Sequence, residues 1–262
     1  MREILEKVAR GEISVDMAER LLRVFAIREI DNLARIDVGR ELRKGMPEII
    51  FAEGKTVEEL ASLAAKMVNE TGRAIISRVS KEHVERLANL IPKDMRLQVH
   101  DKARIIVAKR GNFKVEDAGG RVGILAAGTA DVSVAEEARV IAEEMGCQVL
   151  TAYDVGVAGI HRLLAPLKDM IAKDVDVLIV VAGREGALPS VVAGIVDVPV
   201  IAVPTSSGYG LGEKGLSALI AMLQSCSLGL AVVNIDGGVP AGAVASIIAN
   251  RVAKYRKKAV SH

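Results

Sequence analysis

One cysteine lies between two serines, in Ser225-Cys226-Ser227, outside the apolar periodicity of the residues around it. A cysteine thiolate is a good nucleophile and can form a covalent intermediate with a substrate. A lone cysteine is more often a small buried apolar residue, and Cys147, which leads into an apolar segment, fits that interpretation. Cys226 is therefore the candidate nucleophile.

A glycine turn at Gly128-Thr129-Ala130-Asp131 follows the apolar run 122–127 and precedes an amphipathic segment. Such a turn presents backbone N–H groups and the positive end of a helix to a phosphate. Thr129 can add a hydroxyl donor, and Asp131 can hold a ribose hydroxyl or an amine. The alternative is that Thr129 or Asp131 only caps the helix.

A second loop, Gly183-Arg184-Glu185-Gly186, places a guanidinium and a carboxylate directly after another apolar run. Surface Arg and Glu are usually only solvated, but a buried strand here would deliver both to the edge of the sheet. This placement favours a functional role for Glu185. Arg184 is equally well explained as a ligand contact or as surface charge.

Hydroxyl-rich and acidic loops follow the last two apolar runs, with Ser206, Ser207 and Gly208 in one and Asn234 and Asp236 in the other. A flexible linker is the alternative for the first loop, although linkers are uncommon inside a compact domain. His161 and Arg162 begin a helical segment, where they either contact an anion or form a surface pair.

The elements that must position these residues alternate regularly from Arg121 onward. Continuous apolar runs are typical of strands buried on both faces, and amphipathic segments separate them. The expected strands are 122–127, 148–152, 175–182, 199–204 and 229–234; the expected helices include 133–145, 159–170, 216–224 and 242–254. The pattern predicts a three-layer, doubly wound parallel sheet of the flavodoxin-like α/β class, with ligands at the carboxyl ends of its strands.

The first part of the chain is organised differently. Residues 1–30 are predicted to be helical, with Ser14 and Asp16 capping the second helix. Residues 34–118 mix strands and helices and suggest a small α/β region. We therefore expect an N-terminal region at 1–118 and a catalytic domain at 119–262. A basic tail, 251–258, is expected to be a solvated helix end.

Composition limits the class of protein. The net charge is +2 and aromatic residues are 2% of the chain, so a dedicated nucleic-acid binder is not expected. No apolar run is long enough to cross a membrane, and only two cysteines occur. A reduced, cytoplasmic protein is the expectation. The four histidines share no metal-ligand spacing, so the metal ligands stay unknown.

From Val122 onward the chain resembles PurE-type aminoimidazole ribonucleotide carboxylases. In that family a Gly-Ser-x-Ser-Asp loop holds the phosphoribosyl group, and Gly128 to Asp131 occupies its place. A glycine-rich loop ending in Leu-Pro matches residues 182–190. The purine enzymes carry a catalytic histidine just before Leu-Pro, whereas this chain has Ala187, which makes purine chemistry doubtful.

The whole chain is similar to the LarB family, which begins synthesis of the nickel-pincer nucleotide. The segments that carry the resemblance are 34–37 with Arg40, 43–50, 53–56, 126–137, 153–162, 183–189, 206–210, Cys226 and 232–237. The resemblance implies carboxylation of the pyridinium ring of nicotinic acid adenine dinucleotide and hydrolysis of its phosphoanhydride. The products would be pyridinium-3,5-biscarboxylic acid mononucleotide and AMP.

The same resemblance places the catalytic cysteine at Cys226 and the loop glutamate at Glu185. It adds Asp154, with His161, Arg162, Gly183 and Gly186, to the substrate-binding residues. CO2 or bicarbonate would be the co-substrate, and Mg²⁺ would be the cofactor. A homo-oligomer is implied, an octamer if PurE-type assembly holds. Two alternatives stay open: an aminoimidazole ribonucleotide carboxylase or mutase, and a non-catalytic nucleotide-binding module.

Arginines and a lysine near the start of the chain have two interpretations. Arg35, Arg40, Arg43 and Lys55 either hold a carboxylate or phosphate of the substrate or are ordinary surface charges.

Overall fold

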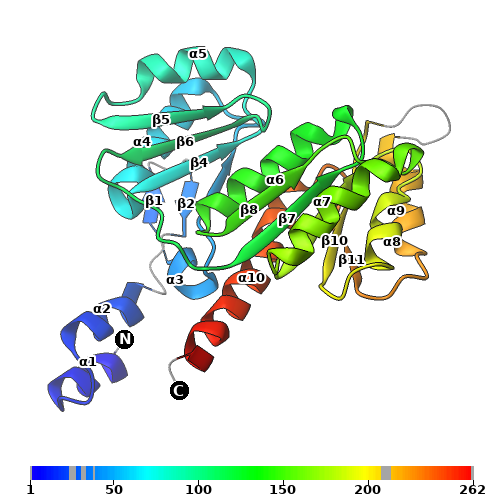
Figure 1. Cartoon of the computed structure of the whole chain (residues 1–262). Coiled ribbons are helices and arrows are strands. Elements are labelled where there is room, and N and C mark those ends of the chain that lie inside the picture. Colours follow the sequence, from blue (N-terminus) through cyan, green and yellow to red (C-terminus); the bar gives the residue numbers. More distant parts are fainter. Residues whose placement is uncertain (1, 24–27, 31–33, 38, 208–213, 261–262) are drawn as a thin grey trace. The chain divides into compact units, whose positions relative to one another are not determined.

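The computed structural model of the chain describes residues 2–23, 28–30, 34–37, 39–207 and 214–260. The chain forms two compact units (Figure 1): residues 1–99 with 105–114, and residues 100–104 with 115–262. The second unit contains the loops that carry the candidate site residues.

The second unit is built on a five-stranded parallel sheet with the order β11-β10-β9-β7-β8. Numbered from β7 along the chain, this order is 2-1-3-4-5, which is the flavodoxin-like arrangement. The predicted fold class is therefore confirmed. Its strands are β7 (Arg121–Ala126), β8 (Gln148–Ala152), β9 (Val177–Ala182), β10 (Val200–Pro204) and β11 (Leu230–Val232).

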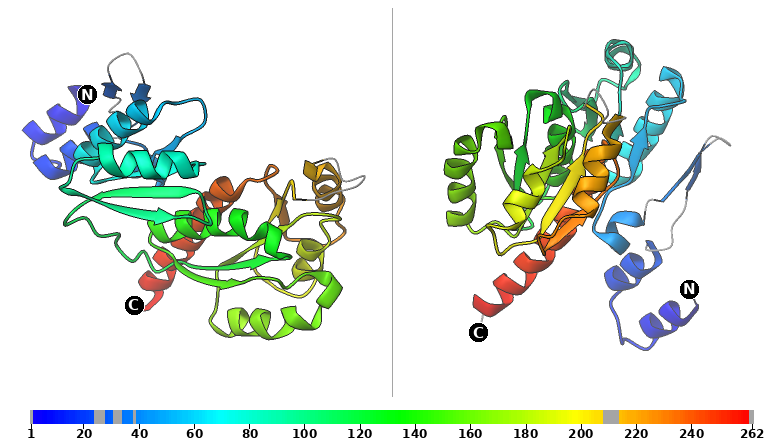
Figure 2. Two further views of the ribbon diagram at one scale, coloured as in Figure 1. Left: turned by 90° about the horizontal axis from the view of Figure 1, so that it is seen from above. Right: turned by 90° about the vertical axis from the view of Figure 1, so that its right-hand side faces the viewer.

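Helices cover both faces of this sheet, as the two views of Figure 2 show. On one face α6 (Val132–Glu144) and α10 (Gly238–Val260) pack on Ile124, Ile179 and their neighbours. On the other face lie α7 (His161–Ala172), α8 (Leu188–Ala193) and α9 (Leu216–Leu223). Alternate residues of each strand face opposite layers, so both sets must be apolar. Burying one such Ile or Leu side chain contributes about 1.5–3 kcal/mol.

The crossover helices explain where a ligand can bind. The chain leaves β7 towards α6 on one face and leaves β9 towards α8 on the other, although these strands are neighbours in the sheet. Such a switch point opens a crevice outside the carboxyl ends of the two strands. The loops that begin at Ala127 and at Gly183 border this crevice.

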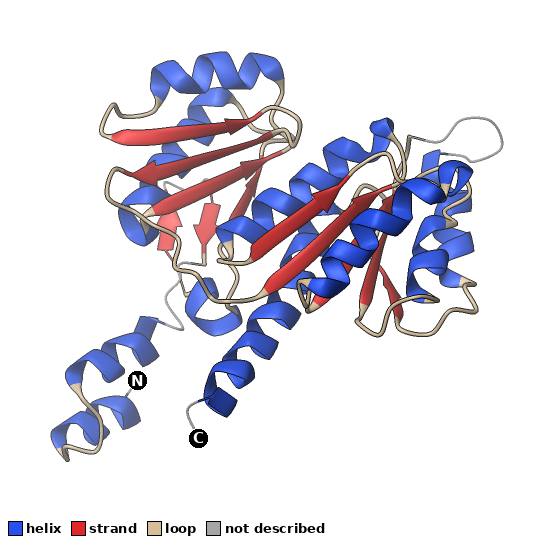
Figure 3. Cartoon of the chain, viewed as in Figure 1, coloured by secondary structure: helices blue, strands red, loops and turns tan. Residues whose placement is uncertain are grey.

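The first unit contains a four-stranded sheet with the order β3-β4-β6-β5 (Figure 3). Its strands are β3 (Ile49–Phe51), β4 (Arg73–Ser77), β5 (Met95–His100) and β6 (Ile105–Arg110), and its larger helices are α4 (Val57–Thr71) and α5 (Lys81–Leu90). A capping box is present at the start of α4, where Thr56 and Glu59 bond to each other's backbone N–H groups.

The N-terminal segment is helical, as expected, in α1 (Arg2–Ala9) and α2 (Val15–Arg23), and Ser14 Oγ accepts the Met17 N–H. The expectation of helix as far as Ile30 is wrong. Strand β1 (Arg28–Ile30) pairs antiparallel with β2 (Ala34–Ile36). A three-residue strand carries too little periodicity to be distinguished from the end of a helix. The short helix α3 (Arg40–Lys44) follows and ends at Gly45, which has φ 68°.

The basic end of α10 is not wholly solvated, which corrects the expectation for residues 251–258. Arg256 forms an ion pair with Asp176, a residue only 7% exposed that precedes β9. Asp176 Oδ2 also accepts the backbone N–H of Arg121 at 2.8 Å. Asp176 therefore joins the start of β7 to the end of α10.

Removing the Asp176 carboxylate is expected to destabilise the protein by about 3 kcal/mol, since the Arg121 N–H loses its acceptor and the Arg256 guanidinium loses its buried carboxylate partner. In a protein of this size Asp176→Ala should lower Tm by roughly 6–12 °C. Asp174→Asn is the matched control, because the Asp174 side chain is 75% exposed and surface changes are usually within about 0.5 kcal/mol. Equal Tm values for the two variants in thermal unfolding would contradict this account.

Among the residues described, no helix is both long enough and apolar enough to span a membrane.

Candidate active site

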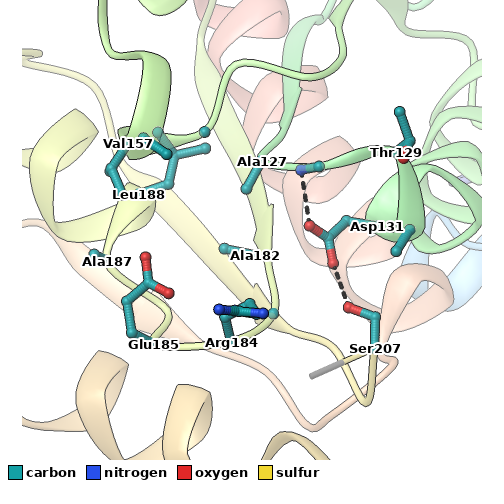
Figure 4. A pocket seen from close by; sticks show the side chains of 15 residues that line it. Ala127, Thr129, Asp131, Val157, Ala182, Arg184, Glu185, Ala187, Leu188 and Ser207 are labelled. Carbon is teal, nitrogen blue, oxygen red and sulfur yellow. Dashed lines mark hydrogen bonds between the residues drawn. The ribbon is translucent and has the colours of Figure 1, made fainter. Parts of the chain in front are cut away.

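A cavity of about 430 Å³ lies at the switch point of the five-stranded sheet (Figure 4). Loops after β7, β8, β9 and β10 contribute to it, so it collects chain segments that are far apart in sequence. Its lining residues are Ala127, Gly128, Thr129, Ala130, Asp131, Gly156, Val157, Ala158, Ala182, Gly183, Arg184, Glu185, Ala187, Leu188 and Ser207. Most of these residues are small, so much of the wall is backbone.

The loop after β7 becomes a 3₁₀ turn, Thr129–Asp131, that runs into α6. The first N–H groups of such a helical segment have no intrahelical acceptor, and the helix dipole favours an anion beside them. Thr129 and Ala130 are exposed at this position. The expected phosphate-binding arrangement is thus available as geometry in the wall of the cavity.

Asp131 is almost fully buried, at 4% exposure, and its carboxylate already accepts three hydrogen bonds. Oδ2 accepts the Gly128 N–H at 2.9 Å. Oδ1 accepts the hydroxyls of Thr205 at 2.6 Å and Ser207 at 2.8 Å. Asp131 thereby joins the loop after β7 to the loop after β10. The carboxylate is used within the protein, which favours the capping alternative over direct contact with a ribose hydroxyl or an amine.

Gly183 is the point where the loop after β9 passes these three side chains. A Cβ atom on Gly183 would lie 2.5 Å from Ser207 Oγ and 2.6 Å from Thr205 Oγ1. Those distances are well inside van der Waals contact, so only glycine fits here without displacing the hydroxyls. Gly156 has a similar role after β8, since a Cβ there would lie 2.8 Å from the carbonyl oxygen of Ala127.

Arg184 and Glu185 form the side of the cavity opposite Thr129 (Figure 4). Both side chains are exposed, and Arg184 has a left-handed φ of 52°. Gly186 follows with φ 64°, and a Cβ there would lie 2.7 Å from the carbonyl oxygen of Ala218 on α9. The turn is therefore pressed against α9, which directs the Glu185 carboxylate to the cavity side. No histidine is among the described residues that line the cavity, and Ala187 is one of them.

Several predicted binding residues lie in neighbouring loops but not in the cavity wall. Asp154 forms an ion pair with Arg162, and His161 is exposed at the start of α7. The segment that follows Asp154 does reach the cavity through Gly156 to Ala158. This loop is anchored by Tyr153, whose hydroxyl donates to Glu136. Burial raises the pKa of Tyr153 above its ordinary value, and the bond to Glu136 adds to the effect.

The loops after β10 and β11 are tied to each other. The Ser206 N–H donates to Asp236 Oδ1 at 2.9 Å, and the Asp236 N–H donates to the Pro204 carbonyl at the same distance. Asn234 accepts the N–H of the next residue. Ser206, Asn234 and Asp236 therefore support the cavity from outside its wall. Gly208, also predicted to bind substrate, lies outside the described residues.

Cys226 is exposed and is not a lining residue of the cavity in its own chain. It lies between the end of α9 and the start of β11, which is the amino-terminal side of the parallel sheet. The neighbouring Ser227 hydroxyl donates to the Ser190 carbonyl of α8 at 2.7 Å. The cavity instead meets α8 at its first residue, Leu188. Cys147, by contrast, is buried as predicted, with its thiol 3.3 Å from Asn250 Oδ1.

Charged residues of the N-terminal region are paired within their own unit. Arg43 pairs with Asp37, Arg40 Nε lies 3.0 Å from Glu48 Oε2, and Lys55 Nζ donates to a backbone carbonyl at 3.0 Å. Burial raises the pKa of Glu48, and Arg40 acts in the opposite direction. These pairs favour a structural role for Arg40, Arg43 and Lys55. The Arg35 side chain lies outside the described residues.

Thr205 belongs to the hydroxyl-rich loop that was expected to be functional, but it was not among the residues singled out in that loop. It is 1% exposed and bonds to both Asp131 and Ser207. Its signal was present, since a hydroxyl directly after a buried strand must find a partner. Within the described residues no group of three or more His, Cys, Asp or Glu is arranged to hold a metal ion.

Comparison with known proteins gives the family. The model described as LarB/PurE-like N-terminal domain matches residues 27–110, and the model described as AIR carboxylase matches residues 121–262. The chain belongs to the LarB family. The predicted resemblance is thereby confirmed over both parts of the chain. Since the second match covers all five strands of the parallel sheet, this LarB-family chain has an AIR carboxylase domain around the cavity.

Curated relatives match either nearly the whole chain or about half of it. Uncharacterized protein MJ0165 of Methanocaldococcus jannaschii is 44% identical over 95% of this chain and 96% of its own length. The N5-carboxyaminoimidazole ribonucleotide mutase of the same organism is 32% identical over 52% of this chain and 87% of its own length. That of Thermotoga maritima is 27% identical over 53% of this chain and 84% of its own length. Membership of a carboxylase family follows.

Proposed function

We propose that the protein carboxylates the pyridinium ring of nicotinic acid adenine dinucleotide and hydrolyses its phosphoanhydride. The observation that carries the proposal is the composition of the cavity, where a carboxylate, Glu185, is present beside Ala187 and no histidine lines the described wall. A proton shuttle through an imidazole is therefore not available from these residues. Membership of the LarB family supports a different chemistry, in which a cysteine activates the ring.

A pyridinium ring is electron-poor and does not attack CO2, so it must first be activated. In the proposed reaction the Cys226 thiolate adds to a ring carbon next to the target carbon, forming a C–S bond and neutralising the ring charge. The resulting enamine attacks CO2, and a C–C bond forms. Glu185 then removes the proton from the carboxylated carbon. The C–S bond breaks, the thiolate leaves and the aromatic ring is restored.

Hydrolysis of the phosphoanhydride releases AMP and leaves the dicarboxylated mononucleotide. The helical N–H groups after Gly128 supply a place for one phosphate, next to the hydroxyl of Thr129. Mg²⁺, which is usually held by one or two carboxylates together with substrate phosphates, would neutralise charge during this step.

Cys226 is separated from the cavity of its own chain, so the proposed reaction needs a second chain. Both groups must reach one pyridinium ring, yet Cys226 is on the amino-terminal side of its own sheet and the cavity is at the carboxyl ends. We therefore propose that the protein is a homo-oligomer in which Cys226 of one chain completes the cavity of another. In the single chain Cys226 is exposed and Leu228 is 91% exposed. An apolar side chain this exposed supports the proposal that a second chain covers this loop.

A direct assay tests the proposed function. Incubation with nicotinic acid adenine dinucleotide, bicarbonate and Mg²⁺ is expected to give AMP and a dicarboxylated mononucleotide, detected by mass spectrometry. ¹³C-bicarbonate should add one heavy carbon to the product. Binding without AMP release would instead favour a non-catalytic nucleotide-binding module.

The second candidate is a purine carboxylase or mutase, favoured by the similarity to N5-carboxyaminoimidazole ribonucleotide mutases. It predicts turnover of aminoimidazole ribonucleotide, and that activity should survive Cys226→Ala. Turnover of this substrate together with no product from the dinucleotide would replace the first proposal by the second.

A further inference from the structure

Ser207, Thr205 and Asp131 form a closed triangle of oxygen atoms at the edge of the cavity. Asp131 Oδ1 lies 2.6 Å from Thr205 Oγ1 and 2.8 Å from Ser207 Oγ, and the two hydroxyl oxygens are 2.7 Å apart. Asp131 and Thr205 are buried, at 4% and 1% exposure. Ser207 is the exposed member, and it alone of the two hydroxyl residues lines the cavity.

The two hydroxyl protons are both used inside this triangle. A carboxylate is only an acceptor, whereas each hydroxyl has one proton to donate and two lone pairs to accept with. Three oxygens and two protons give either two bonds to Asp131 or a chain through one hydroxyl to Asp131. In both arrangements the proton of Ser207 points into the triangle. Towards the cavity, Ser207 can then only accept a hydrogen bond.

We infer that Ser207 acts as a hydrogen-bond acceptor that selects a ligand O–H, with Asp131 as the residue that positions it. This inference rests on the proposed nucleotide substrate and names the part of it that Ser207 recognises. A phosphate or carboxylate oxygen has no proton to give and would face the lone pairs of Ser207. The sugar hydroxyls of a nucleotide do have one. The phosphate belongs at the helical N–H groups after Gly128, on the other side of Asp131.

The geometry separates these two subsites through one residue. Asp131 Oδ2 holds the Gly128 N–H at 2.9 Å, while Oδ1 holds Ser207. The phosphate-side loop and the hydroxyl-side acceptor therefore keep a fixed spacing. Gly183 passes beside the triangle, where its missing Cβ leaves the Ser207 oxygen undisturbed. Discrimination against a ligand that lacks the hydroxyl follows, because the Ser207 acceptor, once covered by the bound ligand, would lack a donor.

A binding cycle tests the inference without requiring turnover. Calorimetry would measure the binding of nicotinic acid mononucleotide and of AMP to wild type and to Ser207→Ala. The 2′-deoxy and 3′-deoxy analogues of each nucleotide would be measured in the same way. These two nucleotides distinguish the two riboses of the dinucleotide. We expect that removal of one particular sugar hydroxyl, from one of the two nucleotides, weakens binding to wild type roughly three- to tenfold. The same removal should have no effect on Ser207→Ala.

Ser62→Ala on α4, in the other unit, is the serine control and should keep the wild-type penalty. If the ribonucleotides bind normally but removal of the hydroxyl weakens binding equally in wild type and in Ser207→Ala, this inference alone is overturned. Undetectable binding of both nucleotides to wild type would overturn the proposed function as well. A penalty that disappears in Ser207→Ala is the result expected, and it identifies which ribose the acceptor contacts.

Discussion

Mixed oligomers of Cys226→Ala and Glu185→Gln chains are expected to carboxylate the dinucleotide, although neither variant does so alone. Loss of a nucleophile should lower carboxylation at least about 10³-fold, and loss of the base roughly 10²- to 10⁴-fold. If Cys226 serves the cavity of a neighbouring chain, some cavities in a mixture receive both wild-type groups. Random assembly in equal amounts restores about a quarter of the wild-type activity.

Co-expression of the two variants with different affinity tags, followed by sequential purification, provides the mixed oligomers. Separately purified variants mixed without exchange of chains are the control and should stay inactive. A second control is the co-expression of wild type with a chain that carries both substitutions. Both wild-type groups are then on the same chain, and the mixture checks that variant and wild-type chains assemble normally. Inactive mixed oligomers would show that Cys226 and Glu185 of one chain act together, or that they do not act on one substrate.

Gly183→Ala is expected to lower kcat/KM about 10²-fold while the protein stays folded. The new Cβ would meet Ser207 Oγ and Thr205 Oγ1 at 2.5 and 2.6 Å, and both hydroxyls are held by Asp131. Relief requires moving the loop after β10 or the loop after β9, which carries Glu185. A displacement of about 1 Å in such a site costs roughly 10² in rate.

Gly194→Ala is the matched control, because it lies at the end of α8 with φ −75° and its nearest contact to a Cβ is 3.5 Å. That variant should keep the wild-type kcat/KM and Tm. Overpacking at Gly183 should cost about 1–3 kcal/mol of stability, measurable by thermal unfolding. Wild-type kinetics for Gly183→Ala would mean that the Asp131, Thr205 and Ser207 triangle is not part of the catalytic machinery.

The two experiments address different parts of the site. The chain-mixing experiment asks how the nucleophile reaches the cavity, whereas Gly183→Ala asks whether the cavity needs its present geometry. Asp131 holds this geometry, because it fixes the loop after β7 to the loop after β10 on opposite sides of Gly183. A substrate that spans the cavity would therefore contact loops whose spacing is set by a single carboxylate.

The five parallel strands were predictable because each is a continuous apolar run, which a strand covered on both faces requires. Their bounds differ from the expected ones by a few residues, and α10 begins at Gly238, four residues before the expected start at Gly242. The three-residue strand β1 was not predicted, because it lies inside the segment expected to be helical. Charge alone predicts a solvated end for α10. It carries no information on the buried Asp176, which pairs with Arg256 although the two are 80 residues apart in the sequence.

The sequence by itself determined the order of strands and helices, the family resemblance and the loops at the carboxyl ends of the strands, since these depend on local patterns and short motifs. Tertiary structure alone decided what Asp131 does, because its partners Thr205 and Ser207 are 74 and 76 residues away along the chain. It also separated Cys226 from the cavity, because a residue before a parallel strand and a residue after one lie at opposite ends of the sheet. The type of each residue was visible in the sequence, and only the fold placed each one beside its partners.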